Sequence, residues 1–431
     1  MGNGVTRFSD ANLRLKISRY LSKRAAGTPW TSNASPSHSF SGAVVIPSLA
    51  ESVNLPQTLE SLSLNPADLL DHFIFLVVVN HCVDASGAEK ADNHETLKML
   101  PFWKQRFGLK HLLWVDAASA GSELPAGQGV GLARKIGLDL ALPLLNCRDD
   151  DPLLICLDAD TLVQADYLPA IIRHFEGASA GGASIPYRHQ SAADPAGQCA
   201  IDRYELFLRT YVLGLQLAGS PYAFHTVGSA MACRASAYVA AGGMNRRCAG
   251  EDFYFLQQIH KTSGVASLFG TVVHPSPRAS QRVPFGTGRA VGDMLAEGEQ
   301  RLLFYQPIVF SILAEWLTCV AENTGADGSV LLSRADRISP FLGGFLKQAD
   351  FSASWDKLRR NNPEQARVAG VFHGWFDAFR SMRLIHHLSA HAYPRIAPGR
   401  AVPPLLERAG VVSPDTVEGQ LELLRTLQHV V

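Results

Sequence analysis

Two aspartates, Asp158 and Asp160, follow an apolar run in LLICLDADTL with one alanine between them. Alternate residues of an extended segment point to the same side, so the two carboxylates repel each other unless a cation lies nearby. Mg²⁺ and Mn²⁺ bind carboxylate oxygens together with substrate phosphates. The pattern therefore predicts a site for a divalent cation and a nucleotide diphosphate. A solvated turn at the start of a helix would explain the same residues, and the spacing alone does not choose between the two.

A second acidic pair, Glu251 and Asp252, stands in CAGEDFYFLQQI. A carboxylate beside a metal site can act as a general base that takes the proton of an attacking hydroxyl. Acidic residues are also favoured in the first turn of a helix, where they face the positive end of the helix dipole. The residue types leave both interpretations open.

A histidine, His274, ends a short apolar run, and three arginines follow it in a loop rich in Gly and Pro: Arg278, Arg282 and Arg289. Imidazole ligates transition metals, and the planar guanidinium pairs well with diphosphate oxygens. A capping histidine followed by a solvated loop is the alternative. The segment is therefore a candidate for both metal and phosphate binding.

The glycine-rich segment AGQGVGLARK, residues 126–135, suggests a dinucleotide-binding turn. The third glycine of that motif is missing, because Leu132 occupies its position, and the segment follows the third predicted strand rather than the first. A nicotinamide cofactor is therefore not predicted. The segment can still bring backbone N–H groups and Arg134 toward phosphates at the start of a helix.

Alternating strands and helices must position these residues. Short runs rich in Val, Ile and Phe predict strands over residues 42–47, 72–80, 111–116, 153–158 and 181–187. Helical spacing predicts helices over residues 52–64, 92–107, 129–145 and 164–175. Connections too long for hairpins then predict a doubly wound α/β sheet. Ligands of such sheets bind at the carboxyl ends of the strands, where Asp158 and Asp160 fall.

Changes in composition divide the chain into three parts. Residues 1–41 hold a basic amphipathic helix and a linker rich in Gly, Ser and Pro, residues 42–295 hold the α/β pattern, and residues 296–431 are helical. The N-terminal helix could lie on an anionic membrane, or it could pack on the main domain with its basic face in solvent.

The balance of charge and the cysteines exclude several classes of protein. Lys+Arg and Asp+Glu both number 39, so no net charge attracts nucleic acid. The 7 cysteines are scattered without a CxxC pair, which predicts neither a zinc site nor a disulfide framework. No apolar run approaches the ~18 residues of a membrane span. A cytoplasmic protein is expected, with peripheral membrane contact through the N-terminal helix as an alternative.

Taken in order, these segments resemble a family-2 glycosyltransferase of the GT-A fold. The resemblance covers residues 42–290 and rests on VVIPSLAE, VVVNH, GLARKIGLDLA, LDADTL, GSAMACRASAYVAAGGM, GEDFYFLQQI and VVHPSPRASQR. It implies a mixed Rossmann-like sheet flanked by helices, with a helical C-terminal region, and a UDP- or GDP-sugar as donor. The Q-x-x-R-W element of processive polysaccharide synthases is missing, which implies that the enzyme adds a single sugar.

The resemblance also implies a role for each candidate residue. Asp252 matches the catalytic base, with Glu251 beside it. Asp160 matches the metal ligand, Asp158 a residue that contacts ribose or metal, and His274 a further metal ligand of some members. The remaining matches lie along the donor nucleotide, its diphosphate or its sugar: Pro47, Glu51, Asn80, Asp84, Arg134, Gly228, Ser229, Arg282 and Arg289.

Two positions depart from the family pattern. Asn80 stands where many members carry an aspartate that reads the base or ribose, and Lys135 replaces the asparagine that usually follows Arg134. An amide both donates and accepts hydrogen bonds, so the identity of the base stays open. Asp84 could partly take over the missing carboxylate.

The implied reaction is a metal-dependent, inverting displacement of the diphosphate by an acceptor hydroxyl, with Mn²⁺ or Mg²⁺ as the cation. A nucleotidyltransferase is one alternative. It needs a basic, glycine-rich loop after the first strand, and PSLAESVN contains neither glycine nor lysine. A catalytically inactive scaffold that binds nucleotide-sugars is the other alternative. The sequence does not identify the acceptor.

Overall fold

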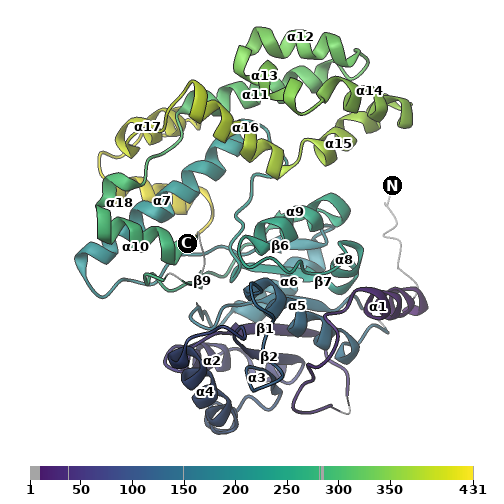
Figure 1. Cartoon of the computed structure of the whole chain (residues 1–431), viewed down its shortest axis with the longest axis vertical. Helices are drawn as coiled ribbons and strands as arrows, with labels where there is room; N and C mark the ends of the chain where they lie inside the picture. The colour runs from purple at the N-terminus through teal and green to yellow at the C-terminus, as the bar shows by residue number, and fades with distance from the viewer. Residues whose placement is uncertain (1–9, 37, 149, 281, 283–285, 431) are drawn as a thin grey trace.

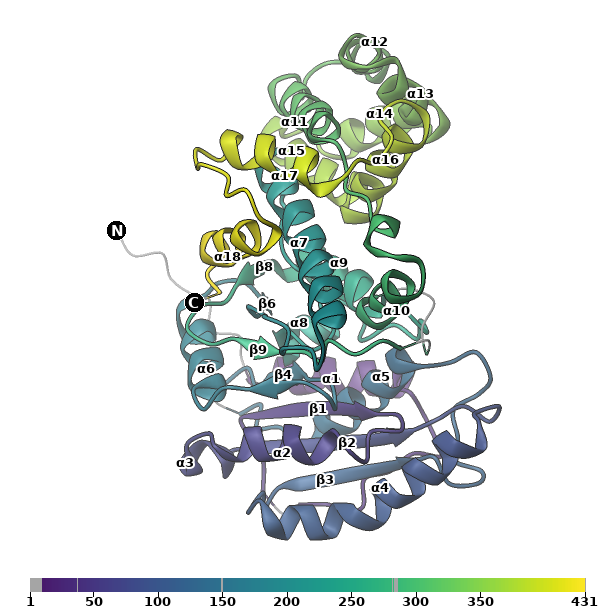
Figure 2. The same cartoon turned by 90° about the vertical axis from the view of Figure 1, so that its left-hand side faces the viewer.

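A mixed α/β layer carries a tall region of helices on one side (Figures 1 and 2). The structure is a computed structural model. It describes residues 10–430, except residues 37, 149, 281 and 283–285.

Seven strands form the central sheet, in the spatial order β3-β2-β1-β4-β7-β6-β8. Their bounds are β1 Gly42–Ser48, β2 Phe73–Asn80, β3 Leu112–Ala117, β4 Leu153–Cys156, β6 Gly182–Ser184, β7 Met231–Arg234 and β8 Val265–Ser267. The first four pair in parallel, and β7 runs antiparallel to both β4 and β6. A separate antiparallel pair consists of β5 (Leu162–Val163) and β9 (Val273–His274).

Helices cover both faces of this sheet. They are α1 Asp10–Arg24, α2 Leu55–Ser63, α3 Ala67–Leu70, α4 Gly87–Arg106, α5 Val130–Ala141, α6 Tyr167–Gly177, α8 Ala235–Ala240 and α9 Glu251–Ser263. Side chains of α1, α5, α8 and α9 share one apolar cluster with the sheet, and those of α2, α4 and α6 share another. All residues of β1 and β2 are therefore buried, which explains why their sequences are almost continuously apolar.

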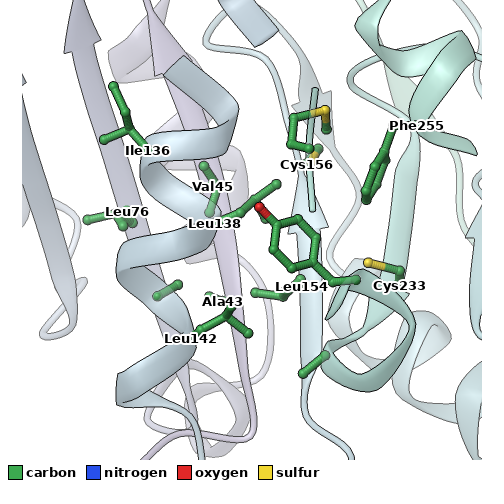
Figure 3. Close-up of a cluster of buried hydrophobic side chains, with 14 of the residues drawn as sticks. Ala43, Val45, Leu76, Ile136, Leu138, Leu142, Leu154, Cys156, Cys233 and Phe255 are labelled. Atoms are coloured by element: carbon green, nitrogen blue, oxygen red, sulfur yellow. The ribbon is translucent and has the colours of Figure 1, made fainter. Parts of the chain in front are cut away.

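Successive residues of each central strand belong alternately to the two apolar clusters. Val45 and Leu76 face α5, as Figure 3 shows, while Val44 lies in the opposite cluster. The helix α5 lies very close to β1, because a Cβ at Gly137 would overlap the Val45 side chain. This contact fixes the height of α5 above the sheet, and with it the position of Arg134 one turn before Gly137.

The remaining helices build the second region. They are α7 Pro195–Leu217, α10 Thr287–Glu297, α11 Pro307–Glu322, α12 Gly328–Ile338, α13 Pro340–Gln348, α14 Phe351–Asn361, α15 Gln365–Trp375, α16 Ala378–His391, α17 Pro398–Arg408 and α18 Val417–Leu427. Their common core includes the fully buried Trp316 and Trp355. Within the described residues, every helix is too short or too polar to span a bilayer.

The predicted fold class is confirmed: a mixed Rossmann-like sheet is flanked by helices and followed by a helical C-terminal region. The division at residue 295 stays a prediction. Although α7 belongs to the predicted transferase domain, its Leu206, Leu213 and Leu215 lie in the core of the later helices. The two regions therefore share one helix.

The N-terminal helix packs on the sheet domain, as one of its two interpretations predicted. Leu13, Ile17 and Tyr20 are buried in the cluster that contains α5 and α8. The Tyr20 hydroxyl donates to Asp139 Oδ1 at 2.7 Å. The apolar face of α1 is therefore occupied, which leaves only its basic face for contact with an anionic membrane. Residues 1–9 of this segment lie outside the described residues.

Candidate active site

The candidate residues meet at one edge of the sheet because of the strand directions. Asp158 follows the carboxyl end of β4, beside the end of β1. Cys156 pairs with Met231 in the antiparallel register of β4 and β7. The residues before β7, including Gly228, therefore lie at the same edge as the residues after β4.

Arg134 joins three of these segments. Its guanidinium is buried and forms ion pairs with Asp158 and Glu251, and Glu251 is the first residue of α9. A Cβ at Gly228 would overlap the same guanidinium, so only glycine permits this close approach. The predicted Arg134, Asp158, Gly228 and Glu251 are thus brought together around one charge.

The neighbouring Asp160 has a different cation. Arg278 Nη2 lies 3.0 Å from Asp160 Oδ2, and the same guanidinium also pairs with Glu51. Arg282 adds a second ion pair to Glu51, with Nη1 2.5 Å from Oε1. In the protein alone, the two aspartates therefore do not share a cation, because each has its own arginine. The predicted Glu51 and Arg282 belong to this second cluster.

Three carboxylates remain close together in spite of these arginines. Burial, followed by the charges of Glu51 and Asp158, raises the pKa of Asp160 to about 7, while Arg278 and Arg282 oppose the shift. The largest cause is burial, and the two neighbouring carboxylates add to it. A divalent cation bound at Asp160 would offset the charge of these carboxylates.

Among the described residues, no group of three His, Cys, Asp or Glu side chains is close enough to hold a metal ion. Mg²⁺ and Mn²⁺ need only one or two carboxylates when substrate phosphates complete the shell. Asp160 meets that requirement, with Asp158 as the second carboxylate, so these residues fit a cation that arrives with a diphosphate.

His274 has the protonation that a metal ligand needs. Its Nδ1 lies 3.0 Å from the Arg188 carbonyl oxygen, and a carbonyl can only accept. Burial lowers the pKa of His274, which favours the neutral ring with a lone pair on Nε2. Its role as a ligand stays a prediction.

Asp252 is the better placed of the two acids for proton transfer. It is half-buried, and its Oδ1 accepts a hydrogen bond from the Phe253 N–H at 2.7 Å. Burial raises the pKa of Asp252, opposed by the charge of Arg134, and a raised pKa makes a carboxylate a stronger base. Glu251 is instead buried and held by Arg134, so its surroundings suit a positioning role.

The structure places four other predicted residues outside these two clusters. Asn80 is buried, and its Nδ2 donates to the carbonyl oxygens of Ser48 at 3.1 Å and Val78 at 2.9 Å. Asp84 is exposed in the loop after β2, and Pro47 is buried within β1. Arg289 lies on α10 and pairs with Asp293, with Nε 2.9 Å from Oδ1. Their donor contacts stay predictions.

A cleft of about 380 Å³ opens beside the second cluster. Its lining includes Arg278, Ser280 and Arg282 from the loop after β9, and Glu89 from the start of α4. The cleft is therefore lined by two of the arginines that were predicted to meet a diphosphate, and both of them pair with Glu51, which follows β1.

Two residues near the site had no sequence signal. Gln190 donates through Nε2 to the carbonyl oxygens of Asp160 at 2.9 Å and His274 at 2.7 Å. Tyr204 on α7 lies close enough to Asp252 to feel its charge. Burial and that charge raise the pKa of Tyr204 to about 12. Neither belongs to a local motif, and only the folded chain brings them to the edge.

Comparison with known proteins gives limited likeness. No family model matches the sequence, and neither does any curated protein. One match among solved structures is S. aureus TarS 1–349 in complex with UDP-GlcNAc, at 12% identity, a TM-score of 0.38, and coverage of 90% of this chain and 91% of that chain. Another crystal structure of S. aureus TarS is matched over only 36% of its length, with 54% of this chain covered.

Two further matches are named as a transferase and a synthase. The mannosyltransferase PcManGT from Pyrobaculum calidifontis, in complex with GDP-Man and Mn²⁺, has 14% identity, a TM-score of 0.39, and coverage of 86% and 95% of the two chains. Glucosyl-3-phosphoglycerate synthase from Mycobacterium tuberculosis has 14% identity, a TM-score of 0.33, and coverage of 73% and 86%. With TM-scores below 0.5, these likenesses carry no weight for the function, which must come from the geometry of the site.

Proposed function

We propose that the protein is a glycosyltransferase that moves one sugar from a nucleotide-diphosphate donor to an acceptor hydroxyl. The observation that carries the proposal is the position of Arg134, which ties Asp158 after β4 to Glu251 at the start of α9. This bridge brings the candidate base Asp252 to the edge where Asp160 can meet a diphosphate.

The donor would lie over the carboxyl edge of the sheet, along the cleft lined by Arg278 and Arg282. Guanidinium groups suit the diphosphate because they donate two parallel hydrogen bonds to neighbouring oxygens. Asp160 and Asp158 would hold Mn²⁺ or Mg²⁺, with His274 as a further candidate ligand. When bound, the cation would supply Lewis-acid stabilisation of the departing diphosphate.

Asp252 would take the proton of the acceptor hydroxyl. Its raised pKa favours that step, since a stronger base accepts a proton more readily. Arg134 and Glu251 would hold the start of α9, so that the carboxylate keeps its place. A single displacement from the face opposite the diphosphate inverts the anomeric configuration.

The cysteines support a reducing, cytoplasmic setting. All seven are free, and three of them, Cys147, Cys156 and Cys233, are buried as small apolar side chains.

The test combines nucleotide binding with turnover. UDP or GDP with Mn²⁺ should raise the melting temperature, and one UDP- or GDP-sugar should be hydrolysed slowly without acceptor. The D252N variant should lose turnover by about 10²–10⁴-fold and keep nucleotide affinity within about twofold. Loss of nucleotide binding in D252N would contradict the role of the base, and wild-type binding without any turnover would favour the inactive scaffold.

A further inference from the structure

One charged side chain of the C-terminal helix α18 reaches a buried carboxylate on α7. Glu205 on α7 is fully buried, and its Oε1 accepts from Arg209 Nε at 2.9 Å and from Arg425 Nε at 2.8 Å. Arg425 belongs to α18, which packs along α7 in both views (Figures 1 and 2). The last helix thus holds a carboxylate that lies 220 positions earlier in the chain.

The other oxygen of Glu205 fixes the segment that precedes α7. Its Oε2 accepts from the His189 backbone N–H at 3.1 Å and lies 2.7 Å from His189 Nδ1. Arg209 also donates to the carbonyl oxygen of Tyr187. Main chain and side chain of this segment are therefore held from the side of α7.

The next residue along the chain faces the candidate donor site. Gln190 Nε2 donates to the carbonyl oxygens of Asp160 and His274, at 2.9 and 2.7 Å, and its backbone N–H donates to the Pro275 carbonyl at 2.9 Å. The amide of Gln190 is thus a bridge between the segment after β4 and the end of β9. An unbroken series of bonds runs from Arg425 through Glu205, His189 and Gln190 to Asp160.

The surroundings of Glu205 favour its ionised form. Burial alone would raise the pKa of Glu205, but the hydrogen bond from His189 and the charges of Arg209 and Arg425 hold it well below its usual value. A buried carboxylate with these donors costs more to form than an apolar contact of similar size. The arrangement fixes the positions of its partners more tightly than an apolar contact would.

We propose that Arg425 and Gln190 are positioning residues of the donor site, and that α18 is part of that site although it makes no contact with the donor. This inference rests on the proposed function, because it concerns the residues that would hold the cation and the diphosphate. Arg425 fixes Glu205 and His189, which set the place of Gln190. Gln190 in turn holds the main chain at Asp160 and His274.

The test compares two variants of α18 in the full chain. R425M removes the charge and keeps the length of the side chain. L421A removes apolar packing from the core that α18 shares with α7, and Leu421 has no part in the charged series. Urea unfolding measures the stability of each variant, and calorimetry measures the Kd for UDP or GDP in the presence of Mn²⁺.

We expect R425M to weaken nucleotide binding by about tenfold or more, as loss of an outer partner of a metal site does. L421A should keep the Kd for the nucleotide within about twofold of the wild-type value. This should hold even if L421A loses as much stability as R425M. Q190M should weaken binding at least as much as R425M, and the double variant should be no weaker than Q190M alone, since both act on the same carbonyls.

The outcomes separate the two levels of the proposal. A wild-type protein that binds neither nucleotide would overturn the proposed function together with this inference. If the wild type binds the nucleotide and R425M has the same Kd as L421A, the inference alone is overturned. If R425M does not fold, Q190M, which leaves the buried charges intact, decides between the same outcomes.

Discussion

Arg134 and Glu251 are 117 positions apart in the chain, and they form a buried ion pair that joins the second turn of α5 to the first residue of α9. The same guanidinium holds Asp158. A cation shared by two carboxylates in this way is both a structural link between two helices and a fixed charge beside the candidate base. Removal of the Arg134 guanidinium should therefore lower both the stability and the activity of the protein.

The variant R134M should lower the free energy of unfolding by about 3–5 kcal/mol, because two acids lose their buried partner. Urea denaturation measures the change. R301M removes an arginine from an exposed ion pair with Glu297 and should cost less than about 1 kcal/mol. Equal losses in the two variants would show that the buried bridge adds nothing.

A methyl group at residue 228 should disturb the site without changing any charge. G228A puts a Cβ into the space of the Arg134 guanidinium, so the ion pairs to Asp158 and Glu251 must shift. We expect turnover to fall by about 10²-fold, as small displacements at catalytic groups do. G177A has open space around its Cβ and should keep wild-type turnover. Normal activity of G228A would mean that the bridge tolerates movement.

The variant D160N should make the protein more stable at pH 8 and remove cation-dependent nucleotide binding. The pKa of Asp160 rises from 3.8 to about 7 in the folded state. Between these values the native state holds a proton that the unfolded chain has released, so the stability contributed by this group is lost as the pH rises. Asparagine removes that loss.

Unfolding of D160N in urea at pH 8 should therefore need up to about 4 kcal/mol more free energy than unfolding of the wild type, since each unit of the shift corresponds to about 1.4 kcal/mol. The difference should shrink toward pH 4, where the aspartate is protonated in the native state. A variant that is less stable than the wild type at pH 8 would contradict the raised pKa that burial, Glu51 and Asp158 give to Asp160.

A buried histidine should make the protein sensitive to acid. Burial and the charge of Arg209 lower the pKa of His225 from 6.5 to about 3. Below pH 6.5 His225 binds a proton in the unfolded chain but not in the native state. The free energy of unfolding therefore falls by up to about 1.4 kcal/mol for each pH unit. In H225N this loss between pH 6.5 and 5 should be smaller, as urea unfolding at several pH values can measure. H94N, at an exposed histidine of α4, should behave as the wild type does.

Local patterns predicted the sheet and the first cluster of the site. The runs that became β1, β2 and β4 are apolar because both faces of the sheet are covered, and the D-x-D pattern marks where β4 ends. The charge pattern suggested a cation near Asp158 and Asp160, but it could not show that two arginines supply the nearest positive charges.

The outer parts of the site left no trace in the sequence. Gln190 and Arg425 act through bonds to main-chain carbonyls and to a carboxylate far away in the chain. A carbonyl group is present at every position, so no residue pattern records such a contact. The antiparallel direction of β7 is equally invisible locally, although it decides that Gly228 reaches the edge of the sheet.

The sharing of α7 between the two regions has a consequence for synthesis. The whole sheet is encoded before residue 268, yet the apolar side of α7 stays bare until the later helices have been made. Because α18 packs on the middle of that helix through Arg425 and Glu205, a nascent chain on the ribosome would carry a finished sheet and an incomplete candidate site until residues 417–427 emerge.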